Sequence, residues 1–469
     1  MSRGEKRRRR GSFDLLRSLT SAGGGSFDEI AAICERYRAK QADGGEVRMT
    51  QDALFERLWN GSAAMEEWTA AVSHGAITHV AENIITVHTT YFCGSVTAIR
   101  TSEGLVLIDT AKPETAQQTL DVIRSWDDAP IHTVIFTHGH IDHTSGITVI
   151  DAEAERRGLP RPRIIAHRNV ARRMQRYEDT HGFNSLVQGQ QFNKPGYVYP
   201  IGQRRPDEVY DDRMSLFIGG EQIDLFHGRG ETDDATFVWL PERRVLASGD
   251  FVIWVFPNAG NPRKVQRYAA EWAAALRRME QLEPAVLIPG HGPVVFGEER
   301  AGQMLRDGAE ALEHLVRETL ALLNRGATLD EILRGVKVPA EYLAKPYLLA
   351  KYDDPEFLVR GIYHFYAGWF DGNAAHLKPA QTAELAAELA GLAGGADKLA
   401  ERALALAGQG QARLAVELAE LAGAAMPDDG QIQAIRAEVL RTLIGAESSL
   451  MGKAFLAVYE REATRRSKA

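Results

Sequence analysis

The hydrophobic and polar positions divide the chain into a first part that mixes strands with helices and a second part that is helical. Up to about residue 300, short apolar runs rich in β-branched residues predict strands, among them "HTVIFTH", "RPRIIAH", "EQIDLFHG", "TFVWLPERRVLASGD" and "PAVLIPGHG". Apolar positions at helical spacing predict helices at "TAQQTLDVIRSW" and "VQRYAAEWAAALRRMEQL". The mixture predicts an α/β domain over residues 47–300.

Beyond this domain the strand pattern stops. Helical spacing returns in residues 301–335, and from about residue 380 the chain is rich in Ala and Leu, with breaks at Gly-Gln-Gly and Pro-Asp-Asp-Gly. The pattern is typical of stacked helical hairpins similar to tetratricopeptide units. We therefore expect an all-helical domain over residues 301–460.

The chain begins with a strongly basic run, "MSRGEKRRRR". A twin-arginine export signal would carry an apolar stretch of about 7–15 residues after the arginines, and Asp14 and Arg17 interrupt the region where it would lie. We interpret residues 1–46 as a disordered basic tail followed by a short helix near residues 27–40.

Composition narrows the class of protein. The net charge of −8 and a pI of about 6.0 argue against a nucleic-acid-binding protein. Apolar runs of the roughly 20 residues that span a bilayer are lacking, so membrane insertion is not expected. The two cysteines, Cys34 and Cys93, cannot build a disulfide framework. This cysteine content fits a reducing, cytoplasmic location.

The segment "FTHGHIDHTSG", residues 136–146, concentrates metal-binding side chains directly after a predicted strand. It carries His138, His140, Asp142 and His143 within six positions. Neutral imidazole and carboxylate are ligands that zinc, iron and manganese accept, and a loop that leaves a strand can turn them toward one point. The segment therefore predicts a metal site.

These residues resemble the signature of the metallo-β-lactamase superfamily, and the rest of that pattern is present in the same order. "LVLIDT" offers Asp109 as the carboxylate that steadies a ligand, "VLASGD" offers Asp250 as the bridging carboxylate, and "LIPGHGP" offers His291. The resemblance implies an αββα sandwich, in which two β-sheets pack face to face between outer helices, with a dinuclear metal site at one edge.

One position points to a branch of that superfamily. Glu231, in "GRGETDDAT", stands where most members carry a histidine, and this carboxylate is a feature of alkylsulfatases. "YHFYAGWFDGNAAHLKPA", residues 363–380, is similar to a segment that follows the metal domain in that branch. The resemblance implies that the helical domain makes a homodimer.

The resemblance also implies a role for each ligand. His138, His140 and Glu231 would hold one metal ion, Asp142, His143 and His291 the other, and Asp250 would bridge them. The expected ions are two Zn²⁺, with other divalent metals as alternatives. Two such ions can share a hydroxide that attacks an ester, and Asp142 and Asp250 are the expected catalytic carboxylates.

Two sulfate-binding features of alkylsulfatases are missing. No histidine follows Asp250 closely, and Ala321 takes the position of an arginine. Formal charges add a second argument, because Asp142, Glu231, Asp250 and one hydroxide cancel the four positive charges of the metals. Such a site suits monoanionic or neutral esters: sulfate monoesters, phosphodiesters and carboxyl esters.

Substrate contacts are expected from two segments. The run "FVIWVFPNAGNP" follows Asp250, and the insert of residues 176–208 would form another wall. The expected contacts are Trp254, Phe256, Asn258, Asn261, Arg263, His181, Asn184 and Tyr199. A cation near the site would alter the charge argument, and the candidates for it are Arg229, Arg263, Lys264 and Arg267.

The favoured function is metal-dependent hydrolysis of a small-molecule sulfate ester. Phosphodiester or carboxyl-ester hydrolysis on the same site is the first alternative. A non-hydrolytic di-iron protein of the same superfamily is the second. A nuclease is disfavoured because no basic stripe follows residues 3–10.

Overall fold

The computed structural model describes residues 51–73, 75–90 and 94–469. The predicted basic tail, the predicted helix near residues 27–40, Cys34 and Cys93 lie outside the described residues. The chain forms two compact units, which are described separately. The first holds the described residues up to Val187 together with Tyr197–Trp369, and the second holds Gln188–Gly196 and Phe370–Ala469.

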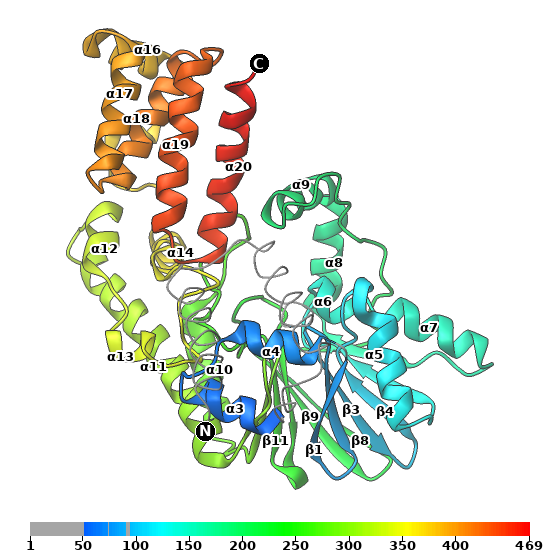
Figure 1. Ribbon diagram of the computed structural model, residues 1–469. Helices are drawn as coiled ribbons and strands as arrows, with labels where there is room; N and C mark the ends of the chain where they lie inside the picture. Colours follow the sequence, from blue (N-terminus) through cyan, green and yellow to red (C-terminus); the bar gives the residue numbers. More distant parts are fainter. Residues whose placement is uncertain (1–50, 74, 91–93) are drawn as a thin grey trace, which may run out of the picture. The chain divides into compact units, whose positions relative to one another are not determined.

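Two β-sheets make up the centre of the first unit (Figure 1). The seven-stranded sheet follows chain order: β1 (Ala76–Ala81), β2 (Ile84–His88), β3 (Ser95–Thr101), β4 (Gly104–Ile108), β5 (Ile131–Ile135), β6 (Arg163–His167) and β7 (Glu208–Tyr210). Its first four strands pair antiparallel, and β4 to β7 pair parallel.

The second sheet has six strands in the order β13-β12-β11-β10-β9-β8. They are β8 (Arg213–Ile218), β9 (Glu221–His227), β10 (Thr236–Leu240), β11 (Val245–Gly249), β12 (Val286–Pro289) and β13 (Val295–Phe296). The pair β11 and β12 is parallel and the other neighbours are antiparallel. A 3-10 helix, η2 (Pro241–Arg243), connects β10 to β11.

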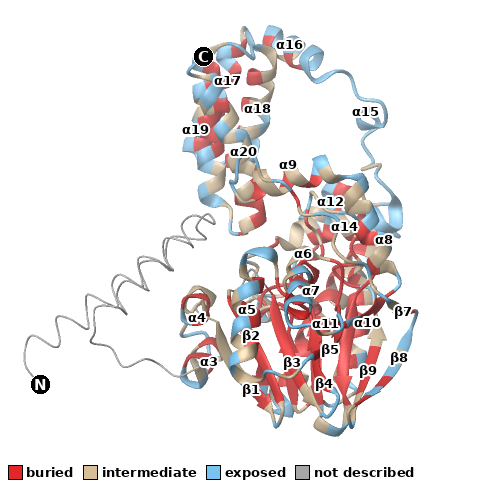
Figure 2. Cartoon of the chain, turned by 90° about the vertical axis from the view of Figure 1, so that its right-hand side faces the viewer, coloured by how far each residue is buried: buried red, intermediate tan, exposed pale blue. Residues whose placement is uncertain are grey.

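The sheets face each other across one apolar core. Ile99, Val106 and Ile165 of the first sheet pack with Leu225 and Val238 of the second. Strands β3, β4, β6 and β10 carry apolar side chains on both faces, and most of their residues are buried (Figure 2).

Helices cover the outer faces of both sheets. The first sheet is covered by α5 (Pro113–Trp126), α7 (Ile147–Arg156) and α8 (Asn169–Asp179), and a cluster that includes Leu107, Leu120 and Ile150 joins them to the strands. The second sheet is covered by α10 (Ala269–Glu280) and α11 (Glu298–Leu323), where Phe237 and Trp272 belong to one core cluster. This is the αββα sandwich that the sequence predicted.

The helices after residue 300 continue the first unit before the second begins. The same core cluster takes in residues of α11, α12 (Leu329–Gly335) and α14 (Pro355–Ala367), such as Leu312, Ile332 and Leu358. Packing is continuous across residue 300, because α11 buries its apolar face against α10. The remaining helices of this unit are α3 (Gln51–Trp59), α4 (Met65–Val72), α6 (Ile141–Thr144) and α13 (Ala340–Leu343), and α9 (His181–Gln191) begins in it.

The second unit is a helical stack. Its helices are α15 (Ala374–Leu377), α16 (Thr382–Ala393), α17 (Ala396–Gly408), α18 (Ala412–Ala425), α19 (Gly430–Ala446) and α20 (Leu450–Arg466). Small side chains let these helices approach closely, and Ala403, Ala415 and Ala419 are almost completely buried together. Within the ranges that the structure describes, none of the helices combines the length and apolar character that crossing a bilayer requires.

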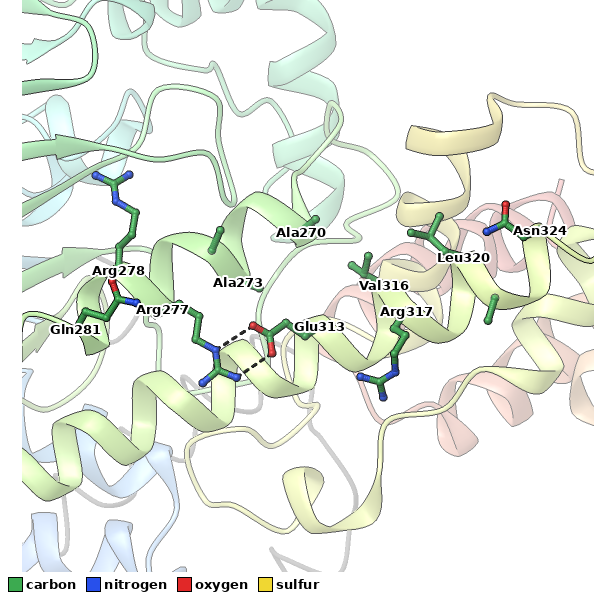
Figure 3. A pocket seen from close by; sticks show the side chains of 12 residues that line it. Ala270, Ala273, Arg277, Arg278, Gln281, Glu313, Val316, Arg317, Leu320 and Asn324 are labelled. Carbon is green, nitrogen blue, oxygen red and sulfur yellow. Dashed lines mark hydrogen bonds and ion pairs between the residues drawn. The ribbon is translucent and has the colours of Figure 1, made fainter.

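A cavity of about 860 Å³ lies between α10 and α11 (Figure 3). Ala270, Ala273 and Val316 line it, and an ion pair of Arg277 with Glu313 crosses it. Ala321, which the resemblance noted in the sequence places at the position of an arginine, also lines this cavity. No predicted metal ligand is among its lining residues.

Candidate metal centre

The seven predicted ligands come from loops at one edge of the two sheets. His138, His140, Asp142 and His143 follow β5, and the last two lie in the short helix α6. Glu231 lies in the connection from β9 to β10, Asp250 directly follows β11, and His291 comes shortly after β12. Each strand is fixed by its buried apolar residues, so the sheets determine where these side chains meet.

The first group of possible ligands consists of His138, His140, Glu231 and Asp250, whose ligand atoms all lie within 4.8 Å of one another. His138 Nε2 lies 3.9 Å from Glu231 Oε2, and His140 Nδ1 lies 3.3 Å from the same oxygen. Burial lowers the pKa of His138 to about 3. Its imidazole is therefore neutral, which is the form that binds a metal.

The second group consists of Asp142, His143 and His291. Asp142 Oδ2 lies 3.5 Å from His291 Nε2 and 3.7 Å from His143 Nε2. Asp250 reaches this group as well, because its Oδ1 lies 3.3 Å from His143 Nε2 and 3.5 Å from His291 Nε2. Its other oxygen lies 3.7 Å from His138 Nε2. One carboxylate thus faces both groups.

Three buried atoms test whether a metal pair fits. Within the described residues, His143 Nε2, Glu231 Oε2 and Asp250 Oδ1 have no hydrogen-bond partner. A buried polar atom without a partner is costly, and all three point into the cluster where cations would contact them. Burial would lower the pKa of His143, but Asp250 and Asp109 raise it well above its usual range, so the site attracts positive charge. The donor set fits two divalent ions.

Asp109 supports this cluster from below. It is 2% exposed, and its Oδ1 accepts the backbone N–H of Thr137 at 2.7 Å. Its Oδ2 lies 2.7 Å from His143 Nδ1 and accepts the Thr137 hydroxyl at 2.7 Å. Asp109 has a φ of 62°, in the left-handed region that aspartate tolerates. It therefore fixes the ring of His143 and the start of the ligand loop.

Gly290 allows the last ligand segment to approach Asp250. A Cβ at this position would lie 2.1 Å from Asp250 Oδ1. Any side chain there would displace the carboxylate that faces both groups. The glycine before His291 is thus required by the close approach of two loops.

Glu231 is held by residues of the loop after Asp250. Asn258 donates its side-chain amide to Glu231 Oε1 at 2.8 Å, and Arg267 forms an ion pair with the same oxygen. Arg267 also donates to the backbone carbonyl of Asn258, and its side chain is almost completely buried. Burial opposes ionisation, but Arg267 and His140 hold the pKa of Glu231 far below its usual range. Glu231 Oε2 stays directed toward the histidines.

A buried ion pair lies next to the ligand loop. Asp234 accepts the backbone N–H of Gly139 at 3.0 Å, and Arg173 Nε donates to its other oxygen at 2.9 Å. Asp234 is completely buried and Arg173 is 3% exposed. The sequence analysis missed both residues, although the two consecutive aspartates after "GET" were a signal for Asp234.

Two of the expected substrate contacts belong to the hydrophobic core instead. Trp254 is 1% exposed, packs against Phe55 and Tyr347, and donates its indole N–H to a backbone carbonyl. Phe256 is completely buried in the same cluster. The apolar run after Asp250 turns inward because α3, α11 and the segment around Tyr347 cover it. Asn258, expected to contact substrate, contacts Glu231.

The other expected contacts hold their own segments together. Asn261 is buried and accepts the backbone N–H of Arg263 at 3.1 Å. His181 Nε2 lies 2.9 Å from the carbonyl of Tyr199, and Asn184 donates to Thr180. Burial and neighbouring groups that include Asp142 raise the pKa of Tyr199 well above its usual range. The contact of these residues with a substrate stays a prediction.

Two polar side chains beside the cluster complete its surroundings. Burial, and then Arg267, lower the pKa of the half-buried Lys264 to about 8, against the opposing charges of Glu231 and Asp142. Burial, and then the charge of Glu231, raise the pKa of Tyr352. The sequence named Lys264 among four possible cations and gave no signal for Tyr352.

Two family models match separate parts of the chain. Residues 92–291 match the model of the metallo-beta-lactamase superfamily, and residues 328–465 match the model of alkyl sulfatase dimerisation. The first match contains all seven candidate ligands and Asp109.

Curated relatives align over most of the chain. A linear primary-alkylsulfatase from a Pseudomonas species is 28% identical over 372 residues, which cover 74% of this chain and 69% of the relative. An (R)-specific secondary-alkylsulfatase from a Pseudomonas species is 28% identical over 376 residues, and this alignment covers 74% of this chain and 57% of the relative. The chain therefore spans little more than half of the second relative.

A solved structure has the same fold. The stereoselective inverting sec-alkylsulfatase Pisa1 from a Pseudomonas species superposes with a TM-score of 0.74 at 24% identity, over 86% of this chain and 67% of that chain. This likeness concerns the fold alone.

Proposed function

We propose that this protein is a dinuclear metal hydrolase that cleaves alkyl sulfate esters. The chain matches the metallo-β-lactamase superfamily in its first part and alkyl sulfatase dimerisation in its second part. The observation that carries the proposal is the meeting of four histidines and three carboxylates in two adjacent groups that share Asp250. The names of the two alkylsulfatase relatives supply the ester class.

For the ligand residues we propose the roles that the resemblance implied. His138, His140 and Glu231 would hold one ion, and the other would be held by Asp142, His143 and His291. We propose Zn²⁺ for both positions because imidazole and carboxylate are its common ligands in catalytic sites. Two bound ions would supply a water that is acidic enough to react near neutral pH, and positive charge beside the ester oxygens.

Asp142 is the more exposed of the two carboxylates that we assign to catalysis. Its side chain is 22% exposed, compared with 11% for Asp250. We infer that Asp142 orients the attacking water and accepts its proton while Asp250 holds the two halves of the site together. A homodimer formed through residues 328–465 and a cytoplasmic location remain parts of the same proposal.

Sulfate release from medium-chain primary and secondary alkyl sulfates tests the activity. The zinc-loaded protein should release inorganic sulfate, and His140→Ala should reduce the rate by at least about a hundredfold, in the range that loss of a group essential to catalysis produces. Metal analysis of the same samples should give two ions per chain in the wild type. Release no faster than in His140→Ala, with clear turnover of a phosphodiester or a carboxyl ester, would reject the sulfatase assignment.

A further inference from the structure

The strongest unassigned feature of the site is the buried arginine behind Glu231. Arg267 is 6% exposed, Asn258 is 5% exposed, and both bind the same carboxylate oxygen, Glu231 Oε1. The opposite oxygen, Oε2, is buried and directed toward His138 and His140. Glu231 can therefore offer Oε2 to a metal ion, while Oε1 is bound by Asn258 and Arg267.

We propose that Arg267 cancels the charge of Glu231, so that the pair acts as a neutral ligand and the site binds anionic esters in preference to neutral ones. This proposal rests on the proposed metal hydrolase. It adds to that function the residue that makes the site prefer substrates with a negative charge.

The charge balance gives the reason. Glu231 places a carboxylate where a histidine would contribute no charge, so the cluster gains one negative charge. Arg267 always carries a positive charge, and its ion pair with Glu231 is almost completely removed from water. Because water screens this pair less than a pair at the surface, the positive charge would act more strongly on bound metal ions and on a nearby anion. With Arg267 beside it, Glu231 lowers the net positive charge of the site no more than a neutral histidine would.

This balance alters the expectation drawn from formal charges. Three carboxylates, Asp142, Glu231 and Asp250, face the candidate ions, and Arg267 offsets one of them. A sulfate monoester brings one negative charge to the reacting group, whereas a carboxyl ester brings none.

A charge series separates this role from a purely structural one. The variants are Arg267→Met, which removes the charge, Arg267→Lys, which keeps it, and the double variant Glu231→His with Arg267→Met, which makes both positions neutral. Arg277→Met is the matched control, because Arg277 pairs with Glu313 beside the α10–α11 cavity and is no part of the site. Zinc content and affinity are measured by chelator competition, and binding of inorganic sulfate and phosphate by calorimetry.

The charge model predicts an order of anion affinities. Arg267→Met should bind inorganic sulfate about tenfold or more weakly than the wild type, the order of magnitude for one poorly screened charge. Arg267→Lys and the double variant should stay within about threefold, and Arg277→Met should equal the wild type. If Arg267→Met does not fold, the double variant decides: folding with two zinc ions and near-wild-type sulfate affinity supports the charge model, and failure to fold overturns it.

Other outcomes contradict the proposal directly. An Arg267→Met protein that holds two zinc ions and binds sulfate as tightly as the wild type would overturn it, as would a wild type that binds neither anion. Failure of the sulfatase assignment gives a different result, since alkyl sulfates would then remain uncleaved while the order of anion affinities still held.

Discussion

At the scale of single residues, the candidate site depends on side chains that contact the candidate ligands from behind. Asp109 and Arg267 each bind a candidate ligand from behind, His143 in one case and Glu231 in the other. Both are almost completely buried, so their hydrogen bonds are not weakened by water. The geometry of the ligands is therefore set by partners as much as by the ligands themselves.

Replacing Asp109 should weaken metal binding. Asp109→Asn keeps the size of the side chain but loses the charge beside His143 Nδ1 and one of its acceptor positions. Loss of such a partner typically costs about 10–100-fold in metal affinity or activity. Zinc affinity from chelator competition checks this, with Asp121→Asn on the exposed face of α5 as the control. An unchanged affinity would contradict the supporting role.

Asp353 should make stability depend on pH. Burial raises its pKa to about 7 from 3.8, and the side chain accepts the backbone N–H groups of Gly260 and Asp354. Between these two pH values the folded chain binds the proton more tightly than the unfolded chain, so this group's contribution to stability falls as pH rises from about 4 to 7.

Asp353→Asn removes that dependence because an amide does not titrate. The difference in the free energy of unfolding, variant minus wild type, should therefore be larger at pH 8 than at pH 5. The expected increase is a few kcal/mol, at roughly 1.4 kcal/mol per pKa unit. Urea denaturation at the two pH values measures it. A difference between variant and wild type that stays constant with pH would refute the pKa assignment.

At the scale of elements, strand ends and helices bring distant segments into contact. The ligand loop follows β5, and α8 supplies Arg173, whose partner Asp234 accepts the backbone N–H of Gly139 between the first two histidines. A helix and a connection between strands thus hold one turn of the loop. The completely buried Asp234 makes this connection, because it binds both Arg173 of α8 and the backbone of Gly139.

Removing Arg173 should therefore destabilise the fold and loosen the loop. Arg173→Met leaves Asp234 as a buried charge with its main partner gone, a change that costs about 3–5 kcal/mol. Burial opposes ionisation, yet Arg173 holds the pKa of Asp234 at about 2, which shows how much the carboxylate depends on it. Urea unfolding measures the loss, and Arg172→Met, at an exposed position of the same helix, should change stability by less than about 0.5 kcal/mol. Equal effects of both substitutions would contradict the model.

At the scale of the whole molecule, the match to the dimerisation model predicts a stable homodimer. Phe365 and Tyr366, at the end of α14 and inside the matched range, are 41% and 45% exposed, and their rings pack together. Exposed aromatic pairs of this kind are common at protein interfaces.

Light scattering at micromolar concentration should therefore give about twice the chain mass of 51.7 kDa. Replacing both aromatic residues, Phe365→Ser with Tyr366→Ser, should shift the protein toward the monomer. Phe217→Ser is the control, because Phe217 is 74% exposed on β8 and lies outside the matched range. A wild type that scatters as a monomer, or a control that dissociates equally, would disprove this interface.

The sequence alone predicted a mixed α/β domain and one concentration of metal ligands. Buried strands carry near-continuous apolar runs, and "HGHIDH" places four possible ligands in one turn, so both are visible in local pattern. The αββα arrangement and the remaining candidate ligands came from the resemblance to a known superfamily. The expectation for Asp109 came from the same resemblance, and its hydrogen bonds to Thr137 and its contact with His143 come from the structure.

Only the tertiary structure decided which side chains face the site and which face the core. Trp254 and Phe256 follow Asp250 closely but turn into the core cluster, whereas Arg267, 17 positions after Asp250 in the sequence, returns to bind Glu231. Periodicity cannot assign an irregular loop to one side or the other, because the orientation of its side chains depends on the helices that cover it. The charge of the site was decided in the same way, since a buried ion pair forms only when two distant segments meet.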